Sequence, residues 1–379
     1  MTTEPLTEVT PSANHHSSHR HLLTNEAGAA PAPIDAIIVP TARPVAYLRT
    51  AIALAKQQGC PLVALCSRRA SAEAAVKLAQ PMNIEIIAVD VAELPRELLP
   101  RFSTSEVLRS TRFNRHADTS LKRNLGLLLA QAAGWERIVF LDDDISVPRA
   151  GDLNDAAGLV GRYAVAGLSI GGYPDNSVVC HAFRDAGGRQ DTFIGGGALV
   201  VGRQSFTSFF PNIYNEDWFF LLDDTKLRPS AVTGLAIQAP YDPYRETTRA
   251  RSEELGDCLA EGLFRLLDTG QRLTDATPAY WAGFLRQRRR FIDEVIALTA
   301  AQADLSAADR VRMTAALKAA RGRNLLIEPA LCMDYMRAWR ADRKQWRLHV
   351  HRAARVCGPG GKEKLLADLG LMHVYRAAA

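Results

Sequence analysis

The sequence predicts an α/β fold built on a mostly parallel sheet. Short β-rich apolar runs occur at 36–40, 61–67, 84–91 and 137–148, and helical stretches separate them. Strands that alternate with helical patterns of about 10–15 residues indicate βαβ units, whose sheets are buried on both faces. Three consecutive carboxylates, Asp142–Asp144, follow the apolar part of the fourth run. Ligands of such sheets collect beyond the carboxyl ends of the strands, so this acidic run marks the first place to look for chemistry.

The helices between these runs carry ordinary boundary signals. The stretch 46–59 is helical and closes on Gly59, and Ser71 is placed to cap the helix that follows the second run. An amphipathic helix at 120–135 leads into the acidic strand. The region 160–245 is rich in strands and turns, and the pattern from Glu246 onward is helical and increasingly basic.

Composition is that of a folded protein with an uneven charge. The 379 residues are 47% hydrophobic and 23% charged, which disfavours whole-chain disorder and fibrous folds. The net charge is +5, yet residues 271–379 carry 20 Lys and Arg against 10 Asp and Glu. The rest of the chain is therefore acidic, and the modest total hides a basic helical end.

We expect three segments. Residues 1–33 form a disordered N-terminal arm, 34–248 a catalytic α/β domain, and 249–379 a basic helical extension. The arm contains a cluster of histidines that could bind a metal, namely His15, His16, His19 and His21. No carboxylate or cysteine nearby in the sequence completes such a site, so a polar tail is the favoured interpretation.

The cysteines and the hydropathy indicate a cytoplasmic protein. Six cysteines lie far apart with no C-x-x-C pair, which fits reduced thiols better than disulfides or zinc ligands. No apolar run approaches the roughly 18 residues that a membrane span needs. The first residues lack the basic and apolar regions of a secretory signal.

The acidic run after the fourth strand is the strongest chemical feature. Adjacent carboxylates repel one another, and a hard divalent cation such as Mg²⁺ or Mn²⁺ relieves that repulsion. Such a cation can bridge to phosphates and act as a Lewis acid. A solvated acidic loop is the alternative interpretation.

Two further features contain no decisive signal by themselves. Asn215-Glu216-Asp217-Trp218 pairs a candidate general base with an aromatic platform for a sugar ring, although an acidic first turn of a helix has the same pattern. Gly195-Gly196-Gly197 permits close approach of the backbone to a ligand, or marks a bulge.

Two basic motifs complete the set. Lys122-Arg123-Asn124 opens the helix before the acidic strand, where helix starts attract anions. Gln287-Arg288-Arg289-Arg290-Phe291 lies in a helical stretch, and its arginines could clamp phosphates or simply face solvent.

In this order the motifs resemble the GT-A glycosyltransferases, most closely the inverting family-2 type. The likeness runs from Asp35 to Phe291 and is most specific at 122–148, where KRNLGLLLAQAAGWERIVFLDDDISVP is similar to that family's RNxG and LDDD segment. The strand with Pro40-Thr41 and the helix after it resemble the family's first unit. The resemblance implies a GT-A sheet and transfer of a sugar from a nucleotide-diphosphate donor to an acceptor hydroxyl with inversion.

The resemblance also implies a role for each matching residue. Asp142 and Asp144 would hold Mn²⁺ or Mg²⁺, Asp217 would be the general base beside Glu216, and the acceptor would meet Gly196, Gly197 and Trp218. Contacts to the donor fall to Pro40, Thr41, Asp90, Arg123, Asn124, Asp142, Asp143, Gln287, Arg288 and Arg290. The last three match a Q-R-x-R-W signature in which Phe291 replaces Trp.

One departure concerns the nucleobase. In the family the second strand usually ends in an Asp that reads the base, whereas here it ends in Leu65-Cys66-Ser67. Asp90, at the end of the next strand, is the candidate for part of that role. The identity of the base therefore stays open.

Several alternatives remain at this level. The same fold serves retaining sugar transferases and nucleotidyltransferases, but the latter carry a glycine-rich loop where this chain has Thr41–Pro44 without glycine. A non-catalytic protein could use the basic helical end on an anionic partner. That end, with Trp, Arg and Lys interleaved, could also contact a membrane surface or a second subunit, or simply pack as a cap. A nucleic-acid acceptor stays among the alternatives.

Overall fold

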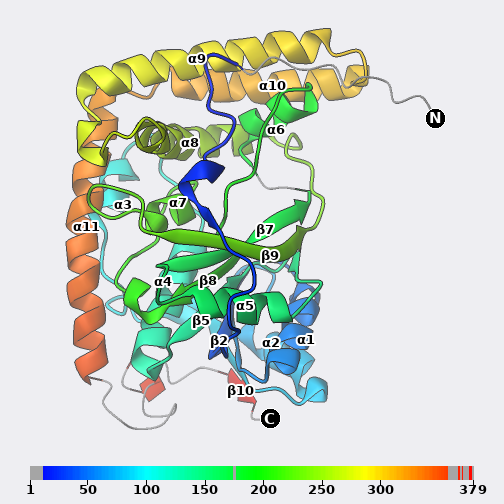
Figure 1. Cartoon of the computed structure of the whole chain (residues 1–379), viewed down its shortest axis with the longest axis vertical. Coiled ribbons are helices and arrows are strands. Elements are labelled where there is room, and N and C mark those ends of the chain that lie inside the picture. Colours follow the sequence, from blue (N-terminus) through cyan, green and yellow to red (C-terminus); the bar gives the residue numbers. More distant parts are fainter. Residues whose placement is uncertain (1–11, 174–175, 357–365, 368, 370–374, 378–379) are drawn as a thin grey trace.

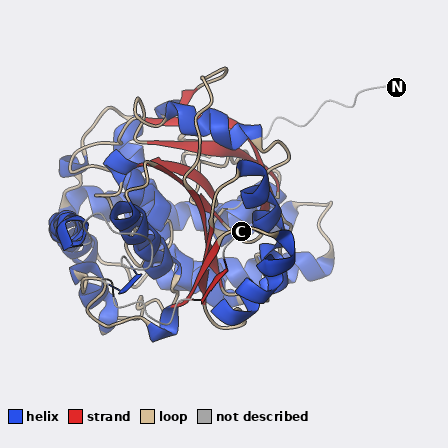
Figure 2. Ribbon diagram, turned by 90° about the horizontal axis from the view of Figure 1, so that it is seen from below, coloured by secondary structure: helices blue, strands red, loops and turns tan. Residues whose placement is uncertain are grey.

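The protein folds around one ten-stranded sheet with helices on both faces (Figures 1 and 2). The computed structural model describes residues 12–173, 176–356, 366–367, 369 and 375–377. The strand order is β1-β9-β7-β8-β5-β2-β3-β4-β10, with β6 paired to β9. Every strand except β6, β8 and β10 runs in the same direction. The predicted α/β class with a mostly parallel sheet is therefore confirmed.

The elements have the following bounds. The strands are β1 Thr24–Asn25, β2 Ala36–Thr41, β3 Leu62–Cys66, β4 Ile86–Asp90, β5 Arg137–Leu141, β6 Ile145–Ser146, β7 Val165–Gly172, β8 Ala198–Gly202, β9 Ser230–Gln238 and β10 Tyr375–Ala377. The α-helices are α1 Arg49–Gln58, α2 Ala72–Ala79, α3 Ser103–Arg109, α4 Thr119–Ala133, α5 Gly151–Leu159, α6 Val178–Asp185, α7 Glu216–Leu221, α8 Thr247–Asp268, α9 Pro278–Ala301, α10 Ala307–Asn324 and α11 Pro329–Val356.

Alternation along the central strands divides the core between the two faces of the sheet. In β2, Ile37 and Val39 belong to the core cluster that also holds the buried side of α1, α2 and α5. Ala36 and Ile38 belong to the larger cluster on the other face, with α4, α8 and α11. Both faces are covered, which explains why these strands read as continuous apolar runs.

Helix α4 lies close against the sheet because a glycine faces the strands. A Cβ on Gly126 would stand 3.0 Å from side-chain atoms of both Ile38 and Phe140. The helix ends at Gly134, whose φ of 73° is the left-handed conformation that glycine adopts readily. This packing fixes the first turns of α4, and with them Lys122 and Arg123, at the carboxyl edge of the sheet.

Strand β8 brings the triglycine segment to the same edge. It runs antiparallel between β5 and β7, so its first residue, Ala198, pairs with Leu141 at the end of β5. The Asp142 N–H then donates to the Gly197 carbonyl at 2.9 Å. The topology thus places the acidic run and the glycines side by side.

The N-terminal arm packs against the body from Ser12 onward, which differs from the disorder expected for residues 1–33. Ser12 donates to Glu294 of α9 at 2.7 Å, β1 pairs with β9, and Ala32 N–H donates to the Asn154 carbonyl at 3.0 Å. In Figure 1 this dark-blue segment crosses from α9 to β2. The partners lie more than 100 residues away, so no local pattern could announce them. Residues 1–11 lie outside the described part.

The basic helical end shares its core with the sheet. Helix α8 begins at Thr247, and its buried face belongs to the same cluster as β2 and β5. Helix α11 packs against α3 and α4 along one side (Figure 1). Trp339 and Trp346 are fully buried, and Trp346 Nε1 donates to the Phe206 carbonyl at 2.9 Å. The tryptophans that suggested a surface-binding helix are core residues, which leaves membrane or subunit contact as a prediction for the charged face alone.

The described cysteines are buried free thiols, namely Cys60, Cys66, Cys180, Cys258 and Cys332. Cys357 lies outside the described residues. Among the helices that the structure describes, none combines the length and apolar character of a bilayer span.

We expect Asp342→Ala to destabilise the protein by about 2 kcal/mol, measured by urea unfolding. The buried Asp342 carboxylate of α11 accepts from the backbone N–H groups of Ser103 and Thr104, at 2.7 and 2.8 Å, and so caps α3. Its loss would leave buried donors without partners. Asp334→Ala, on the same helix but exposed, is the matched control and should change stability by less than about 0.5 kcal/mol. Equal effects of the two variants would contradict this account.

Candidate functional site

The acidic run beyond β5 is neutralised by an arginine of the first loop. Arg43 forms ion pairs with Asp143 at 2.5 Å and with Asp144 at 2.7 Å. Thr41, the last residue of β2, donates its hydroxyl to Asp143 at 2.7 Å. This bond joins the carboxyl ends of the parallel strands β2 and β5 and orients Asp143.

A buried guanidinium links the acidic run to the Glu216-Asp217 pair. Arg123, in the first turns of α4, lies 3.0 Å from Asp142 and 2.8 Å from Glu216. Burial opposes its charge, but Asp142 and Glu216 outweigh that effect and raise the pKa of Arg123. The residue is a permanent buried cation, and each carboxylate depends on it for neutralisation.

The three glycines let charged side chains approach the backbone. A Cβ on Gly196 would stand 2.2 Å from Arg123 Nη1. A Cβ on Gly195 would stand 3.2 Å from Asp217, and a Cβ on Gly197 would stand 3.2 Å from Asp142. The sequence suggested close approach to a ligand or a bulge, whereas the residues approached are the protein's own site residues.

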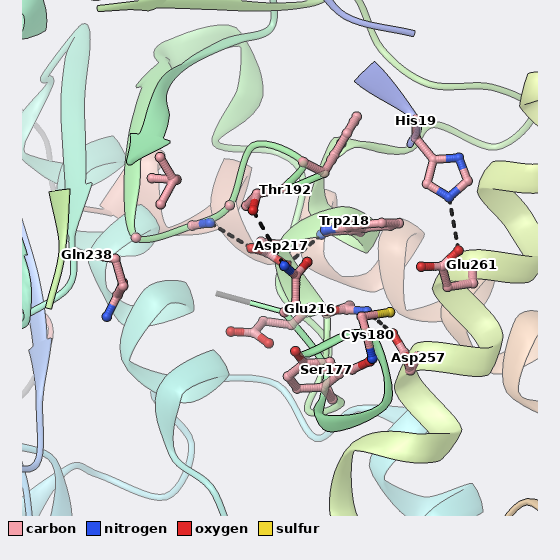
Figure 3. A pocket seen from close by; sticks show the side chains of 18 of the residues that line it. His19, Ser177, Cys180, Thr192, Glu216, Asp217, Trp218, Gln238, Asp257 and Glu261 are labelled. Atoms are coloured by element: carbon pink, nitrogen blue, oxygen red, sulfur yellow. Dashed lines mark hydrogen bonds and ion pairs between the residues drawn. The ribbon is translucent and has the colours of Figure 1, made fainter. Parts of the chain in front are cut away.

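Asp217 is held by two backbone N–H groups at the start of α7. Gly196 N–H donates to Oδ2 at 2.6 Å, and Trp218 N–H donates to Oδ1 at 2.9 Å (Figure 3). Burial, with a further contribution from Glu216, raises the pKa of Asp217 to about 6 against the opposing effect of Arg123. The carboxylate is therefore ionised at neutral pH and far more basic than an ordinary aspartate.

Asp142 has a similar pKa for a related reason. Burial raises it to about 6, Arg123 opposes the shift, and the nearby Asp144 carboxylate adds to it. A cation bound at Asp142 would favour the charged form of that carboxylate and so oppose this shift.

Two cavities meet at Asp142. The inner cavity, of about 230 Å³, is lined in part by Glu216, Asp217, Trp218, Thr192 and His19. The outer cavity, of about 730 Å³, is lined in part by Pro40, Arg43, Tyr47, Asp143 and Asp144. Thr119, Asp142 and Gln238 line both cavities, and Figure 3 shows Gln238 on one side of the inner cavity and Glu261 on the other.

The predicted acceptor residues all line the inner cavity. Gly196, Gly197 and Trp218 contribute to its wall. The Trp218 ring belongs to an aromatic cluster, with centroids 4.9 Å from Phe193 and 4.6 Å from Phe264. Its ring is therefore fixed in orientation, and its half-buried face is available to the cavity.

The structure does not bring the Q-R-x-R residues to the acidic run, so their contact with a donor stays a prediction without support from their position. Arg288 is buried and binds Glu254 and Asp257 of α8, and Gln287 donates to a backbone carbonyl of the arm at 3.0 Å. Arg290 is exposed on α9. Pairing between α8 and α9 decides these positions, and a local motif contains no information about it.

Asn124 and Asp90 likewise have structural partners. Asn124 is buried and exchanges two hydrogen bonds of 2.8 Å with the backbone of Phe210. Asp90 accepts from Ala72 N–H at 2.9 Å at the start of α2. Neither lines the two cavities, so their contact with a donor also stays a prediction without support from their position. Pro40 and Asp143 do line the outer cavity.

Sequence reasoning missed several cavity residues. No motif in the sequence singles out Arg43 or Gln238. Asp257 and Glu261 of α8 line the inner cavity. A sequence pattern could have indicated them, because Glu254, Asp257 and Glu261 recur at helical spacing within a Leu-rich stretch. Acidic side chains on a buried helix face are rare unless they are paired with another group.

Comparison with known proteins finds similarity among solved structures but not in sequence. No protein-family profile matches the chain, and no curated protein matches it in sequence. Among solved structures, the fold is similar to that of a mannosyltransferase from Pyrobaculum calidifontis, determined in complex with GDP-mannose and Mn²⁺. The match covers 81% of this chain and 92% of that one, with 14% sequence identity and a TM-score of 0.45.

We expect Gly196→Ala to destabilise the protein by about 1–3 kcal/mol in urea unfolding. The new methyl group would overlap the buried Arg123 guanidinium, which cannot move without abandoning Asp142 or Glu216. Gly283→Ala is the control, because nothing lies within 4 Å of its Cβ in the middle of α9. The control should be neutral or slightly stabilising, since alanine favours helix. A neutral Gly196→Ala would show that the close approach is not a constraint.

Proposed function

We propose that this protein is a metal-dependent glycosyltransferase of the GT-A type, which transfers a sugar from a nucleotide-diphosphate donor to an acceptor hydroxyl with inversion. The observation that supports it best is that the inner and outer cavities lie side by side and share Asp142 in their lining. A donor in the outer cavity would present its anomeric carbon at this shared lining. An acceptor in the inner cavity would approach from the opposite side, where Asp217 lies.

The acidic run fits a divalent cation. Asp142 and Asp144 offer carboxylate oxygens, the donors that Mg²⁺ and Mn²⁺ prefer, and both line the outer cavity. Gly197 leaves room beside Asp142 that any side chain would fill. A cation bound there would neutralise the charge that develops on the departing nucleotide diphosphate. Arg43 now occupies Asp144, so it would release that carboxylate and turn to the phosphates.

Asp217 would act as the general base. Each of its oxygens accepts one backbone hydrogen bond, which leaves lone pairs for the acceptor hydroxyl. As the hydroxyl oxygen bonds to the anomeric carbon, its proton passes to Asp217 and the bond to the diphosphate breaks with its electron pair. Attack opposite the leaving group inverts the anomeric configuration.

The remaining residues position these groups. Arg123 holds Asp142 and Glu216 in place, so the two halves of the site keep a fixed separation. Trp218 offers an apolar face for a sugar ring beside the base. Preorganised charges of this kind stabilise a transition state without reorganisation during the reaction.

The first test combines a donor panel with two variants. In thermal-shift measurements, one nucleotide sugar should stabilise the wild-type protein only when Mn²⁺ is present, by the linkage of binding to folding. Asp144→Asn should lose this stabilisation. Asp217→Asn should keep it but lower transfer by at least about 100-fold, because the base acts after binding.

Asp224→Asn is the matched control for both variants. Asp224 lies shortly after α7, the helix that begins with Glu216 and Asp217. It is half-exposed, pairs with Arg343 of α11 and lines neither of the two cavities. It should retain stabilisation and turnover. Failure of every nucleotide sugar to stabilise the wild type, or full activity of Asp217→Asn, would overturn the proposal. Retention of configuration in the product would reject the role of Asp217 as base.

The transfer rate should fall at acidic pH. With a pKa of about 6, Asp217 is ionised above that value and becomes protonated below it, so kcat/KM for the acceptor should drop about tenfold per pH unit below about pH 6. The profile would be recorded at saturating donor and Mn²⁺, and Asp224→Asn should reproduce it. A rate that stays constant down to about pH 4.5 would contradict a base of raised pKa.

A further inference from the structure

A second group of metal-type ligands lies on the far side of the inner cavity from the acidic run. One ring nitrogen of His15, the Sγ of Cys180 and a carboxylate oxygen of Glu261 all lie within 4.8 Å of one another. They come from the arm, from α6 and from α8. In the sequence, the histidines of the arm have no carboxylate or cysteine to complete a metal site. The tertiary structure brings both a thiol and a carboxylate to His15.

His15 is prepared as a ligand. Its ring stacks on Phe291 at a centroid distance of 4.1 Å, and Nε2 lies 2.6 Å from the side-chain oxygen of Gln190. An amide oxygen only accepts, so Nε2 donates its proton there and Nδ1 is left bare. Burial lowers the pKa of His15, which favours the neutral ring. Metal-binding histidines are commonly held in this way through their second nitrogen.

Cys180 and Glu261 keep capacity for a ligand. The thiol is 2% exposed and lies in hydrogen-bonding contact with the Ser177 side chain, whose hydroxyl would donate to a thiolate. Glu261 receives one hydrogen bond, from His19 Nε2 at 3.0 Å, and its carboxylate has further lone pairs. A buried thiol beside both a carboxylate and an imidazole is an unusual arrangement for a core that only packs.

The surrounding charges balance without these ligands. The Arg288 guanidinium faces the group, but Glu254 and Asp257 compensate it. His19 is compensated largely by Asp268, with which it forms a short contact. Glu261 shares the His19 cation with Asp268, so its carboxylate, and a Cys180 thiolate if one forms, would still supply negative charge to a bound metal cation.

We propose that His15, Cys180 and Glu261 bind a zinc ion that fastens the N-terminal arm to α6 and α8. A nitrogen, a sulfur and an oxygen donor form the set that Zn²⁺ prefers, whereas Mg²⁺ and Mn²⁺ prefer oxygen alone. The three ligand atoms already lie within 4.8 Å of one another, so a single ion with bonds of about 2.0–2.3 Å could be shared by all three. The Cys180 proton passes to solvent as the zinc–sulfur bond forms.

The fourth coordination position would face the inner cavity. Cys180 and Glu261 line that cavity, so water would complete the tetrahedron from this side. Ser17, Ser18 and His19 of the arm line the same cavity. Zinc would therefore also fix the covering of the cavity by the arm. This inference does not depend on the proposed transfer reaction.

The full-length protein, stripped of metal under reducing conditions, would be titrated with Zn²⁺ against a chromophoric chelator. We expect one equivalent per chain, with affinity reduced at least about tenfold in His15→Ala and in Cys180→Ser. Two matched controls should bind as the wild type does. His21→Ala removes an exposed histidine of the same arm, and Cys60→Ser alters a buried thiol elsewhere.

Cobalt binding tests whether the Cys180 thiolate is a ligand, and proteolysis tests whether the metal holds the arm in place. Co²⁺ should give a thiolate-to-cobalt charge-transfer band in the wild type and in Asp144→Asn, but not in Cys180→Ser. Zinc should slow tryptic cleavage after Arg20 in the wild type and not in His15→Ala. Absence of stoichiometric zinc, an unchanged affinity in Cys180→Ser, or equal loss in Cys60→Ser would each overturn the proposal.

Discussion

The buried Arg123 guanidinium is the interaction on which the site depends. It lies between Asp142 at the end of β5 and Glu216 at the start of α7, two segments that are 74 residues apart in the sequence. Removing one partner of such a buried pair leaves an uncompensated charge, a loss of about 3–5 kcal/mol in measured cases. The packing of α4 on the sheet, through Gly126, is what allows the arginine to reach both carboxylates. Fold and site are therefore stabilised by the same contact.

The position of Arg123 between these carboxylates explains why Gly195–Gly197 are glycines. Three charged side chains converge on one turn of backbone, and any side chain at Gly196 would displace the guanidinium. The same turn donates an N–H to Asp217, so one short segment sets the position of the candidate base and of Arg123. Burial then raises the pKa of Asp217 to about 6, which suits proton transfer near neutral pH.

The N-terminal arm shows how a polar segment becomes ordered without a hydrophobic pattern. His19 is buried between Asp268 and Glu261. Burial alone would lower its pKa, but the hydrogen bonds to both carboxylates raise it to about 9. The cation and its two partners attach the arm to α8 and cover the inner cavity. A composition rich in Ser, Pro and His gives no warning of this, because every partner is distant in the sequence.

The sequence by itself determined the α/β class, the positions of the central strands along the chain and the position of the acidic run after one of them. It could do so because the alternation of strand-like and helical stretches, and the residues that end them, are local properties of the chain. It also indicated Asp142, Asp144 and Asp217, whose motifs lie at element boundaries. Only the tertiary structure decided which other residues join them. Arg43 and Glu261 enter the cavities, while Asn124 and Arg288 turn to partners in the core, because long-range packing sets those distances and no local pattern contains them.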